Sequence, residues 1–594
     1  MTTVTAARGG AWLLGASTPD ETFTPERLTE DHRLIAQTTD EFATGEVLPA
    51  LERLEEKDWD LARALLRRCG ELGLLGVNVP ETYGGVELDT VASLIVSERV
   101  ARSASFGATY GAQANLCILP ILLFGTDDQK QRYLPKLVTG ELVGAYALSE
   151  AGSGSDALGA RARADRQPDG SFRLSGEKMW ITNGGFADVI IVFAKVDGAH
   201  FSAFIVERSF GGVTSGKEEH KMGLHGSSTT PLLLHDVSVP AANLLGEVGK
   251  GHKVAFNVLN FGRFKLGAMC TGGSKAAIGE AARYAAERHQ FDQPIAAFGA
   301  IRHKLGEMSA RTYALEALMY RTAGLVDQHL STSGDARQSA LLGALEEFAV
   351  EASIAKVAGS EVLDFVLDEN VQIHGGNGFV RDYPAERHYR DARVNRIFEG
   401  TNEINRLLIP GMLMKRALKG DLPLIPAART LMDEVMSPAL PSLDAGGDRA
   451  LAAETLAVEA FKKVTLLGIG AAMQRFGAKL QDEQEVLLWL ADLIIDTFAA
   501  ESAVLRARSV QLQPDAAASK AALHEDAARV FVSDAALRVE AAAKQVLAAI
   551  AEGDVLRTNL AALRRLLKVT PADTVAARRR LADDAVARGA YGFA

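Results

Sequence analysis

The chain has 594 residues, 47% of them hydrophobic, and a formal net charge of −11 at pH 7. This length and apolar content predict a large soluble protein of three or four domains. The negative charge argues against a general nucleic-acid binder, because binding to a phosphate backbone relies on clustered Lys and Arg side chains. We expect small molecules or proteins as partners instead.

The three cysteines, Cys69, Cys117 and Cys270, lie far apart and without metal-ligand spacing. This pattern suits a reducing compartment and predicts neither a disulfide framework nor a metal site. An apolar patch at residues 11–16 has no basic region before it, and no later run reaches the roughly 18 apolar residues that a membrane span needs. We therefore predict a cytoplasmic protein.

Apolar residues recur at helical spacing from about residue 25 to 140, as in LARALLRRCGELGLLG. From about 146 to 239 the pattern changes to short runs of branched and aromatic residues, such as DVIIVFAKV, separated by turns such as QPDGS. Helical spacing returns from about 254 to 416. A connection with Pro and Gly follows, and Ala-rich amphipathic segments then run to the end.

These changes predict five segments: a helical domain at 25–143, a β domain at 144–253, a helical bundle at 254–418, a linker at 419–447 and a helical extension at 448–594. The sequence contains no GxxxxGK[ST], strand-linked GxGxxG, HExxH or GxSxG motif. A nucleoside triphosphate, a Rossmann cofactor, zinc and a serine nucleophile elbow are therefore unsupported.

Two stretches of the β region carry residues that suit a ligand. In YALSEAGSGSDA at 146–157, small residues follow a strand and leave backbone N–H groups free for an anion or a planar polar ring edge. In KMWITNGG at 178–185, Trp180 offers an aromatic face and Thr182 a hydroxyl. Taken alone, the first is more simply a hairpin turn and the second a core strand.

Two further stretches lie in the bundle region. Arg263 and Arg288 stand near the ends of helical runs, where a guanidinium can bind phosphate, although a surface salt bridge is the simpler explanation. The sequence GGNG at 375–378 lets a backbone approach a ligand closely, or merely ends a helix. In RIFEGTNEIN at 396–405, the lone carboxylate of Glu399 stands between an aromatic residue and a glycine.

Together these strings resemble the acyl-CoA dehydrogenase family over roughly residues 30–415. The matching strings are YALSEAGSGSD, KMWITNGG, ERHQF, QIHGGNGF and IFEGTNEI, in the family's order. LNFGRF and the helical region after residue 420 are most similar to the very-long-chain branch. The resemblance implies a mainly α fold with a central β-barrel: an N-terminal helical domain, the barrel, a four-helix bundle and a C-terminal helical domain.

The resemblance also implies FAD, held between the β domain and the bundle and partly across a subunit interface. The implied reaction is the α,β-dehydrogenation of long-chain fatty acyl-CoA to trans-2-enoyl-CoA, the first step of fatty acid β-oxidation. Electrons would pass to an electron-transferring flavoprotein. A homo-oligomer is expected, with a dimer favoured because the extension limits further assembly.

Glu399 matches the position of the family's catalytic base, which removes the pro-R α-proton while the β-hydrogen leaves as hydride to flavin N5. Burial beside Phe398 would disfavour the charged form and raise the pKa of Glu399 toward the working range. Gly400 would keep space beside the reacting carbons, and the backbone N–H of Glu399 would bind the thioester oxygen. One branch takes its base from the position of Gly262, where a glycine cannot serve.

The other site residues are implied by the same match. At the flavin ring they are Tyr146, Leu148, Ser149, Trp180 and Thr182. At the FAD diphosphate and adenosine they are Arg288 and Phe291. The residues that reach the FAD of a neighbouring subunit are Gln372, Gly375 and Gly376, and those that follow the base are Thr401 and Glu403. The predicted FAD set is completed by Gly154, Ser155, Ile181 and Phe298.

Predicted substrate contacts are Ser155, Asn260, Arg263, Phe398 and Gly400. Of these, Ser155 and Arg263 correspond to CoA-side contacts, with Arg263 placed for a phosphate or the adenine. Arg302 stands where relatives often have Gln, and the sequence leaves open whether it touches pyrophosphate or solvent. The resemblance implies no metal.

The extension carries no catalytic motif, and we expect the flavin site to form without it. Its apolar stretch VTLLGIGAAM at 464–473 predicts buried bundle core, with peripheral membrane contact as the alternative. Other chain specificity, a flavin oxidase or monooxygenase on the same fold, and an assembly scaffold for a respiratory complex stay open as functions. Retention of Glu399 argues against the scaffold, and a hydrolase using His374 lacks a nucleophile elbow.

Overall fold

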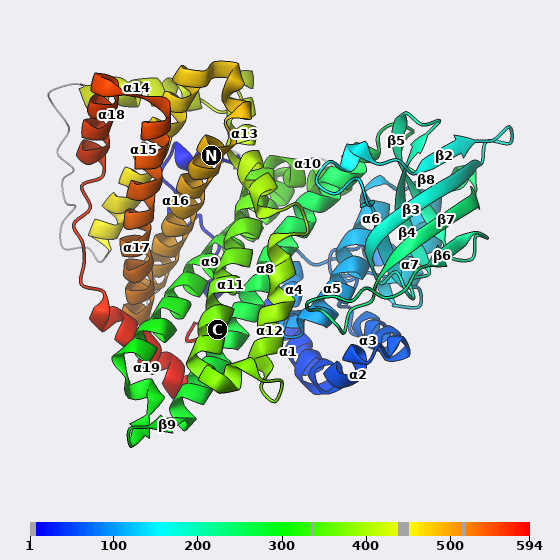
Figure 1. Cartoon of the computed structure of the whole chain (residues 1–594), viewed down its shortest axis with the longest axis horizontal. Helices are drawn as coiled ribbons and strands as arrows, with labels where there is room; N and C mark the ends of the chain where they lie inside the picture. Colours follow the sequence, from blue (N-terminus) through cyan, green and yellow to red (C-terminus); the bar gives the residue numbers. More distant parts are fainter. Residues whose placement is uncertain (1–7, 335–336, 437–450, 514–516, 594) are drawn as a thin grey trace.

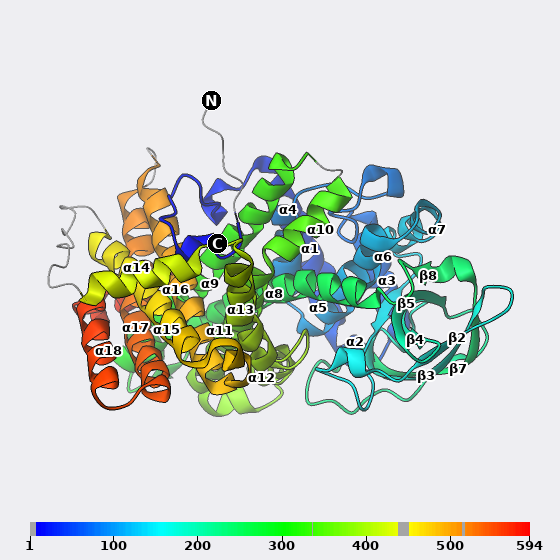
Figure 2. The same cartoon turned by 90° about the horizontal axis from the view of Figure 1, so that it is seen from above.

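The structure, a computed structural model, describes residues 8–334, 337–436, 451–513 and 517–593. A helical domain, a β domain, a helical bundle and a helical extension follow one another along the chain (Figure 1). The bundle lies in the middle, with the β domain on one side and the extension on the other (Figure 2). The predicted class, mainly α with a central β domain, is confirmed.

The N-terminal helical domain consists of α1 (Glu30–Phe42), α2 (Leu51–Glu55), α3 (Trp59–Glu71), α4 (Thr90–Val100), α5 (Ala104–Gly111), α6 (Leu119–Phe124) and α7 (Asp127–Val138). The local sequence determines where a helix begins. At α7 the Thr126 hydroxyl accepts from the N–H of Gln129 at 3.2 Å, and the Gln129 side chain accepts from the N–H of Thr126 at 3.0 Å. This reciprocal cap satisfies two backbone donors that the helix leaves free.

Helices α5 and α6 are joined by a π-helical turn, so that residues 104–124 form one helical run. In the described part of the chain, this run alone is long and apolar enough to cross a membrane, and 78% of its most apolar stretch is buried inside the protein. The sequence analysis expected no run of this length. Its burial is that of a core helix, and it packs against the β domain through β1.

The β domain is one eight-stranded sheet in the order β6-β7-β3-β2-β4-β5-β8, with β1 paired to β4. The strands are β1 (Gly144–Ala147), β2 (Arg163–Arg166), β3 (Phe172–Thr182), β4 (Val189–Val196), β5 (His200–Glu207), β6 (Val213–Ser215), β7 (Thr229–Val239) and β8 (Leu244–Leu245). The branched and aromatic residues of β4 and β5 are almost all buried, which explains why these runs lack polar alternation.

The bundle consists of α8 (Gly251–Glu287), α9 (Gly299–Thr332), α10 (Arg337–Glu347), α11 (Ala349–His374), α12 (Pro384–Ala392) and α13 (Asn402–Lys419), with a small hairpin of β9 (His289–Gln290) and β10 (Gln293–Pro294) between α8 and α9. The extension consists of α14 (Leu424–Met436), α15 (Ala452–Phe476), α16 (Gln484–Gln511), α17 (Ala518–Ile550), α18 (Gly553–Leu566) and α19 (Val575–Arg588). Helix α14 occupies part of the predicted linker, whose remainder from 437 onward lies outside the described residues.

The extension shares a hydrophobic core with the bundle. Phe461 of α15 and Phe498 of α16 belong to the same cluster of buried residues as Phe264 and Tyr313 of the bundle. Deleting the extension would expose this core, which argues against the expectation that the flavin site forms without it. The apolar side chains of the stretch 464–473 lie within that core, as predicted, and offer no free face to a membrane.

The N-terminal segment packs on this shared core as well, which the sequence analysis did not anticipate. The N–H of Gly10 and Nε1 of Trp12 donate to Oε1 of Glu351 on α11, at 2.7 and 3.0 Å. The Trp12 ring lies 4.7 Å from the ring of Phe498. The segment therefore joins the bundle to the extension.

Candidate active site

Glu399 lies between a short 3₁₀ turn and helix α13. Its φ is +57°, a left-handed conformation that a glutamate keeps only when its surroundings hold it there. Gly400 follows with φ +77°, which a glycine adopts without strain. The Thr401 hydroxyl then accepts from the N–H of Ile404 at 3.2 Å and caps α13.

Two buried side chains bind the carbonyl oxygens of this loop. Nε of Arg263 donates to the carbonyl of Glu399 at 3.2 Å. Nδ2 of Asn405 donates to the carbonyls of Gly400 and Thr401, at 2.9 and 3.0 Å. These bonds give partners to the carbonyls of Glu399 and Gly400, which precede the regular helix, and so favour one loop conformation.

The Glu399 carboxylate points at α8 beside Gly262. A Cβ at Gly262 would lie 2.6 Å from Oε2 of Glu399, so any larger residue there would displace the carboxylate. Oε2 is buried and has no hydrogen-bond partner among the described residues. Burial raises the pKa of Glu399 to about 7, although the positive charges of Arg263 and Lys356 act in the opposite direction. A carboxylate with this pKa is a base suited to neutral pH.

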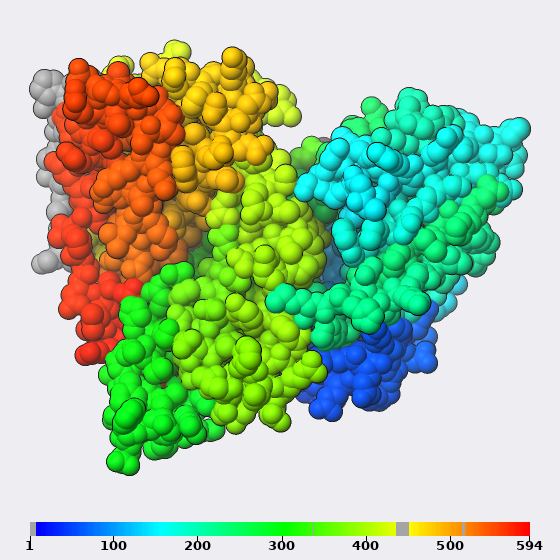
Figure 3. Space-filling model, viewed as in Figure 1, coloured from blue at the N-terminus to red at the C-terminus, as the bar shows by residue number. Residues whose placement is uncertain are grey.

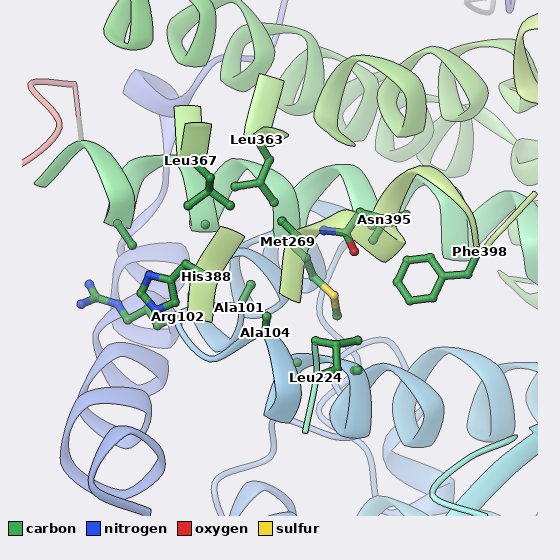
Figure 4. A pocket seen from close by; sticks show the side chains of 16 residues that line it. Ala101, Arg102, Ala104, Leu224, Met269, Leu363, Leu367, His388, Asn395 and Phe398 are labelled. Carbon is green, nitrogen blue, oxygen red and sulfur yellow. The ribbon is translucent and has the colours of Figure 1, made fainter. Parts of the chain in front are cut away.

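An apolar cavity begins at Phe398, next to the base, and ends at Arg102 and His388 (Figure 4). It spans about 650 Å³, part of which is open to solvent. One wall is α8, which contributes Leu266, Met269, Gly273 and Ala276. From Gly262 to Ala276 this helix rises by about 20 Å, so the cavity continues well past the base.

On the side of the β domain lie two residues of the predicted flavin set, Tyr146 and Trp180. Tyr146 has a polar group without a partner among the described residues, and Trp180 has an exposed ring. The Tyr146 hydroxyl is buried without a hydrogen-bond partner in the described part of the chain. Burial, together with the nearby Glu399 carboxylate, raises its pKa well above the usual value. Trp180 has φ +58° and is 58% exposed at a bulge of β3. The surface is hollowed where the β domain meets the bundle (Figure 3).

The loop at 148–155 is held by a buried ion pair. Nζ of Lys178 donates to Oε1 of Glu150 at 2.7 Å and to the carbonyl of Leu148 at 3.1 Å. Glu150 also accepts from the N–H groups of Arg161 and Ala162. This loop keeps Ser149, Gly154 and Ser155 at the edge of the sheet, where a Cβ on Gly154 would meet no described atom within 4 Å.

The predicted FAD residues of the hairpin and of the end of α11 lie apart from Glu399 within one chain, whereas Thr401 and Glu403 follow it directly. Arg288, Phe291 and Phe298 surround the β9–β10 hairpin, at the end of the bundle far from the β domain (Figure 1). Phe291 is 87% exposed and its ring lies 5.9 Å from that of Phe298. At the end of α11, Gly375 has φ +58°, and a Cβ there would meet no described atom within 4 Å.

Family models of acyl-CoA dehydrogenase domains match most of the chain. The N-terminal, middle and C-terminal domain models match residues 29–141, 145–237 and 249–413, and a second C-terminal domain model matches 460–565. A probable acyl-CoA dehydrogenase of Bacillus subtilis (strain 168) is 46% identical, over 97% of this chain and 97% of its own length.

The crystal structure of an acyl-CoA dehydrogenase complexed with FAD from Bacillus anthracis superposes with a TM-score of 0.96 at 47% identity, covering 99% of this chain and 100% of that one. The chain belongs to the acyl-CoA dehydrogenase family. It is an oxidoreductase with that family's fold. The B. anthracis protein matches the full length, the extension included.

Similarity within the acyl-CoA dehydrogenase family does not fix the acyl chain length. The bovine mitochondrial very long-chain specific enzyme is 42% identical over 60% of this chain and 53% of its own length. The bovine mitochondrial short-chain specific enzyme is 38% identical over 69% of this chain and 96% of its own length. The predicted very-long-chain branch therefore stays a prediction.

Arg263 and Asn260, the predicted substrate contacts on α8, bind each other and neighbouring carbonyl groups. Arg263 lies in the middle of α8, is 7% exposed, and uses Nε on the Glu399 carbonyl and Nη1 on Oδ1 of Asn260 at 2.9 Å. Nδ2 of Asn260 donates to the carbonyl of Leu345. Arg263 therefore binds the loop that carries Glu399, and its predicted CoA contact stays a prediction.

Arg302, whose role the sequence left open, pairs with Asp583 of α19. In this chain it therefore binds the extension. Thr401 and Glu403 lie in the first turn of α13, where the Thr401 hydroxyl is used as the helix cap.

Three residues that shape the site were missed by the sequence analysis: Lys356, Asn402 and Asn405. Lys356 is a charged residue within an otherwise apolar helical run, ASIAKVAG, and that mismatch is a signal that could have found it. The two asparagines lie in the quoted string GTNEIN, but their contacts depend on which face of α13 meets α11.

Proposed function

We propose that this protein catalyses the FAD-dependent α,β-dehydrogenation of long-chain fatty acyl-CoA, with Glu399 as the base. The observation that carries the proposal is a carboxylate of raised pKa, with one oxygen buried and unpartnered among the described residues, on the residue that follows Phe398 of an apolar cavity. A site that abstracts a proton next to a carbonyl needs a base of this kind, and an alkyl chain needs such a cavity.

The residues on the β domain fit a flavin. The buried Tyr146 hydroxyl lacks a partner, Trp180 exposes an indole face, and the loop at 148–155 presents small residues. A planar ring with polar edges would satisfy these groups. Bound FAD would supply the acceptor for the hydride that leaves the β-carbon.

Residues of the chain itself would abstract the proton, bind the thioester oxygen and exclude water. Glu399 takes the α-proton, and its backbone N–H binds the thioester oxygen as negative charge develops there. Gly400 leaves room for the reacting carbons, and Arg263 holds the Glu399 carbonyl so that the carboxylate keeps its direction. Phe398 and an acyl chain in the cavity exclude water from the base.

The shape of the cavity favours a long acyl chain. Its lining includes several small residues, among them Gly107, Gly273 and Ala276, and the last two lie one and two turns past Met269 on α8. A butyryl group would fill only the end beside Phe398. Unfilled apolar space lowers the affinity for a short acyl group and holds it less precisely. A longer acyl chain should therefore be preferred.

The exposed aromatic residues at the hairpin support a site completed by a second copy. Phe291 and the end of α11 at Gly375 are open to solvent in one chain and lie away from Glu399. We infer a homodimer in which they contact the FAD of the neighbouring subunit. We also propose an electron-transferring flavoprotein as the electron acceptor and a location in the cytoplasm.

An anaerobic absorption titration with palmitoyl-CoA, butyryl-CoA and isovaleryl-CoA tests the function. We expect palmitoyl-CoA to bleach the bound flavin and the two short thioesters to bleach it weakly. Bleaching by a short thioester alone would contradict the proposed preference for a long acyl chain. Failure of all three would contradict the dehydrogenase proposal, and rapid reoxidation by O₂ would favour an oxidase or monooxygenase.

A further inference from the structure

The residue that opens α13, directly after the catalytic loop, is tied to α11. Nδ2 of Asn402 donates to Oγ of Ser360 and to Oε1 of Glu361, both at 3.0 Å. Nζ of Lys356 donates to Oδ1 of Asn402 at 2.6 Å. Asn402 is 3% exposed, so all its side-chain bonds are made inside the protein. These bonds therefore link α11 to the residue that directly follows the loop carrying Glu399.

Glu361 shares its carboxylate between Asn402 and Arg406. Nη1 and Nη2 of Arg406 donate to the two oxygens of Glu361 at 2.6 and 2.9 Å, a two-point ion pair. Nε of Arg406 donates to Oδ1 of Asp492 on α16 at 2.8 Å. A continuous set of contacts thus runs from the catalytic loop to the extension.

Helix α13 contacts α11 on one side and α16 on the other. The Arg406 side chain between them is 17% exposed, compared with 39% for Asp492. Glu361 and Asp492 are 40% and 39% exposed, so solvent weakens each pair alone, and the orientation of the guanidinium is set by bonding to both carboxylates at once. Asp492 is the member of this set that belongs to the extension.

We propose that the extension holds the catalytic loop in its left-handed conformation through Asp492, which is a positioning residue for Glu399. Glu399 is strained, and strain of this kind persists only where the surroundings enforce it. Without the Asp492 carboxylate, Arg406 keeps one partner and the first turn of α13 loosens. The base then moves relative to the α-carbon, which lowers kcat more than it raises KM. This inference rests on the function proposed above.

The test compares Asp492→Asn with Asp496→Asn in the full-length FAD-loaded protein. Asp496 lies one turn further along α16 and pairs with Arg538 of α17 at 2.7 Å, so it controls for the loss of a carboxylate on this helix. We expect the rate of flavin bleaching at saturating palmitoyl-CoA to fall about fivefold to tenfold for Asp492→Asn. FAD content and KM should stay near wild type, and Asp496→Asn should keep the wild-type rate. Asp492→Glu should restore part of the rate.

A second measurement needs no turnover. Amide hydrogen exchange of residues 397–406 should become faster in Asp492→Asn and stay unchanged in Asp496→Asn. Unchanged rate and exchange in Asp492→Asn, or equal losses in both variants, would overturn the proposal. If wild type is bleached by none of the thioesters, the proposed function fails, and the exchange measurement still decides whether Asp492 orders the loop.

A double variant distinguishes an effect through the contact between Asp492 and Arg406 from a general loss of activity. In an Arg406→Gln background, Asp492→Asn should have no further effect on the bleaching rate, because the contact that it removes is already lost. Additive losses would show that Asp492 acts on the site by another route and would overturn the assignment.

Discussion

Two glutamates with a buried carboxylate oxygen have pKa values shifted in opposite directions. Glu399, in the catalytic loop, has a carboxylate oxygen without a partner among the described residues, and burial raises its pKa to about 7. Glu316, on α9, is 1% exposed and binds Arg506 at 2.5 Å, the Tyr591 hydroxyl at 2.9 Å, and Lys275. Burial acts to raise the pKa of Glu316, but Arg506 and Lys275 outweigh it and lower the pKa.

The difference separates a reactive group from a structural one. Arg506 of α16 also pairs with Glu26 at 2.7 Å, so the network around Glu316 joins the bundle to the extension and to the N-terminal region. Both carboxylates have a shifted pKa, and a shifted pKa alone would mark either one as a candidate functional site. The direction of the pKa shift, together with the cavity beside Phe398, favours Glu399 as the proposed base.

Glu399→Gln should produce the largest effect on activity. The amide keeps the shape of the side chain but cannot accept the α-proton, so the rate of flavin bleaching by palmitoyl-CoA should fall by about 10³-fold. Stopped-flow absorption under anaerobic conditions measures this rate, and FAD content and palmitoyl-CoA binding should persist. A variant that retains a tenth of the wild-type rate would remove Glu399 from the role of base.

Arg506→Met should produce the largest effect on stability. It removes the cation shared by Glu26 and Glu316 and leaves buried negative charge unpaired, which costs about 3–5 kcal/mol. Denaturant unfolding measures this loss, with Glu399→Gln as the matched comparison that should not destabilise the fold. Equal stability of the two variants would show that the network around Glu316 does not join the extension to the bundle.

Acidification should separate the two glutamates in the wild-type protein. Since only the ionised form of Glu399 is a base, bleaching should slow about tenfold for each pH unit below its pKa. The folded pKa of Glu399 lies above its ordinary value of 4.5, so its contribution to stability is present at low pH and is lost as the pH rises toward about 7. Glu316 has a lowered folded pKa, so its contribution is present above 4.5 and is lost only on further acidification.

Circular dichroism and flavin retention, followed beside the bleaching rate, check this prediction. Activity should be lost between about pH 7 and 5 while the fold and the bound flavin remain. Simultaneous loss of rate and fold would mean that the same groups control both.

Ala276→Phe should narrow the cavity without touching the base. A phenyl ring at this position fills space beyond Met269, so kcat/KM for palmitoyl-CoA should fall about tenfold while that for butyryl-CoA stays unchanged. Equal losses on both thioesters would show that the acyl chain does not extend along α8.

The sequence predicted best the parts of the site that lie in short contiguous strings. Glu399 stands within IFEGTNEI, and Tyr146 and Trp180 stand within strings of the β domain, so each could be identified without knowing the packing. The bond from Arg263 to the Glu399 carbonyl was not predicted, because it depends on which face of α8 meets the loop that carries Glu399. Asp492 could not be found, because its contact with Arg406 joins residues 86 positions apart through a helix packing that no local pattern encodes.

Arg302→Gln should have the smallest effect. Arg302 pairs with Asp583, but the two side chains are 25% and 57% exposed, and pairs of this kind contribute less than about 1 kcal/mol to stability. Denaturant unfolding and FAD content of the purified variant measure the outcome, with Asp583→Asn as the control that removes the same pair from the other side. If Arg302→Gln loses FAD while Asp583→Asn does not, Arg302 reaches the cofactor of a neighbouring subunit.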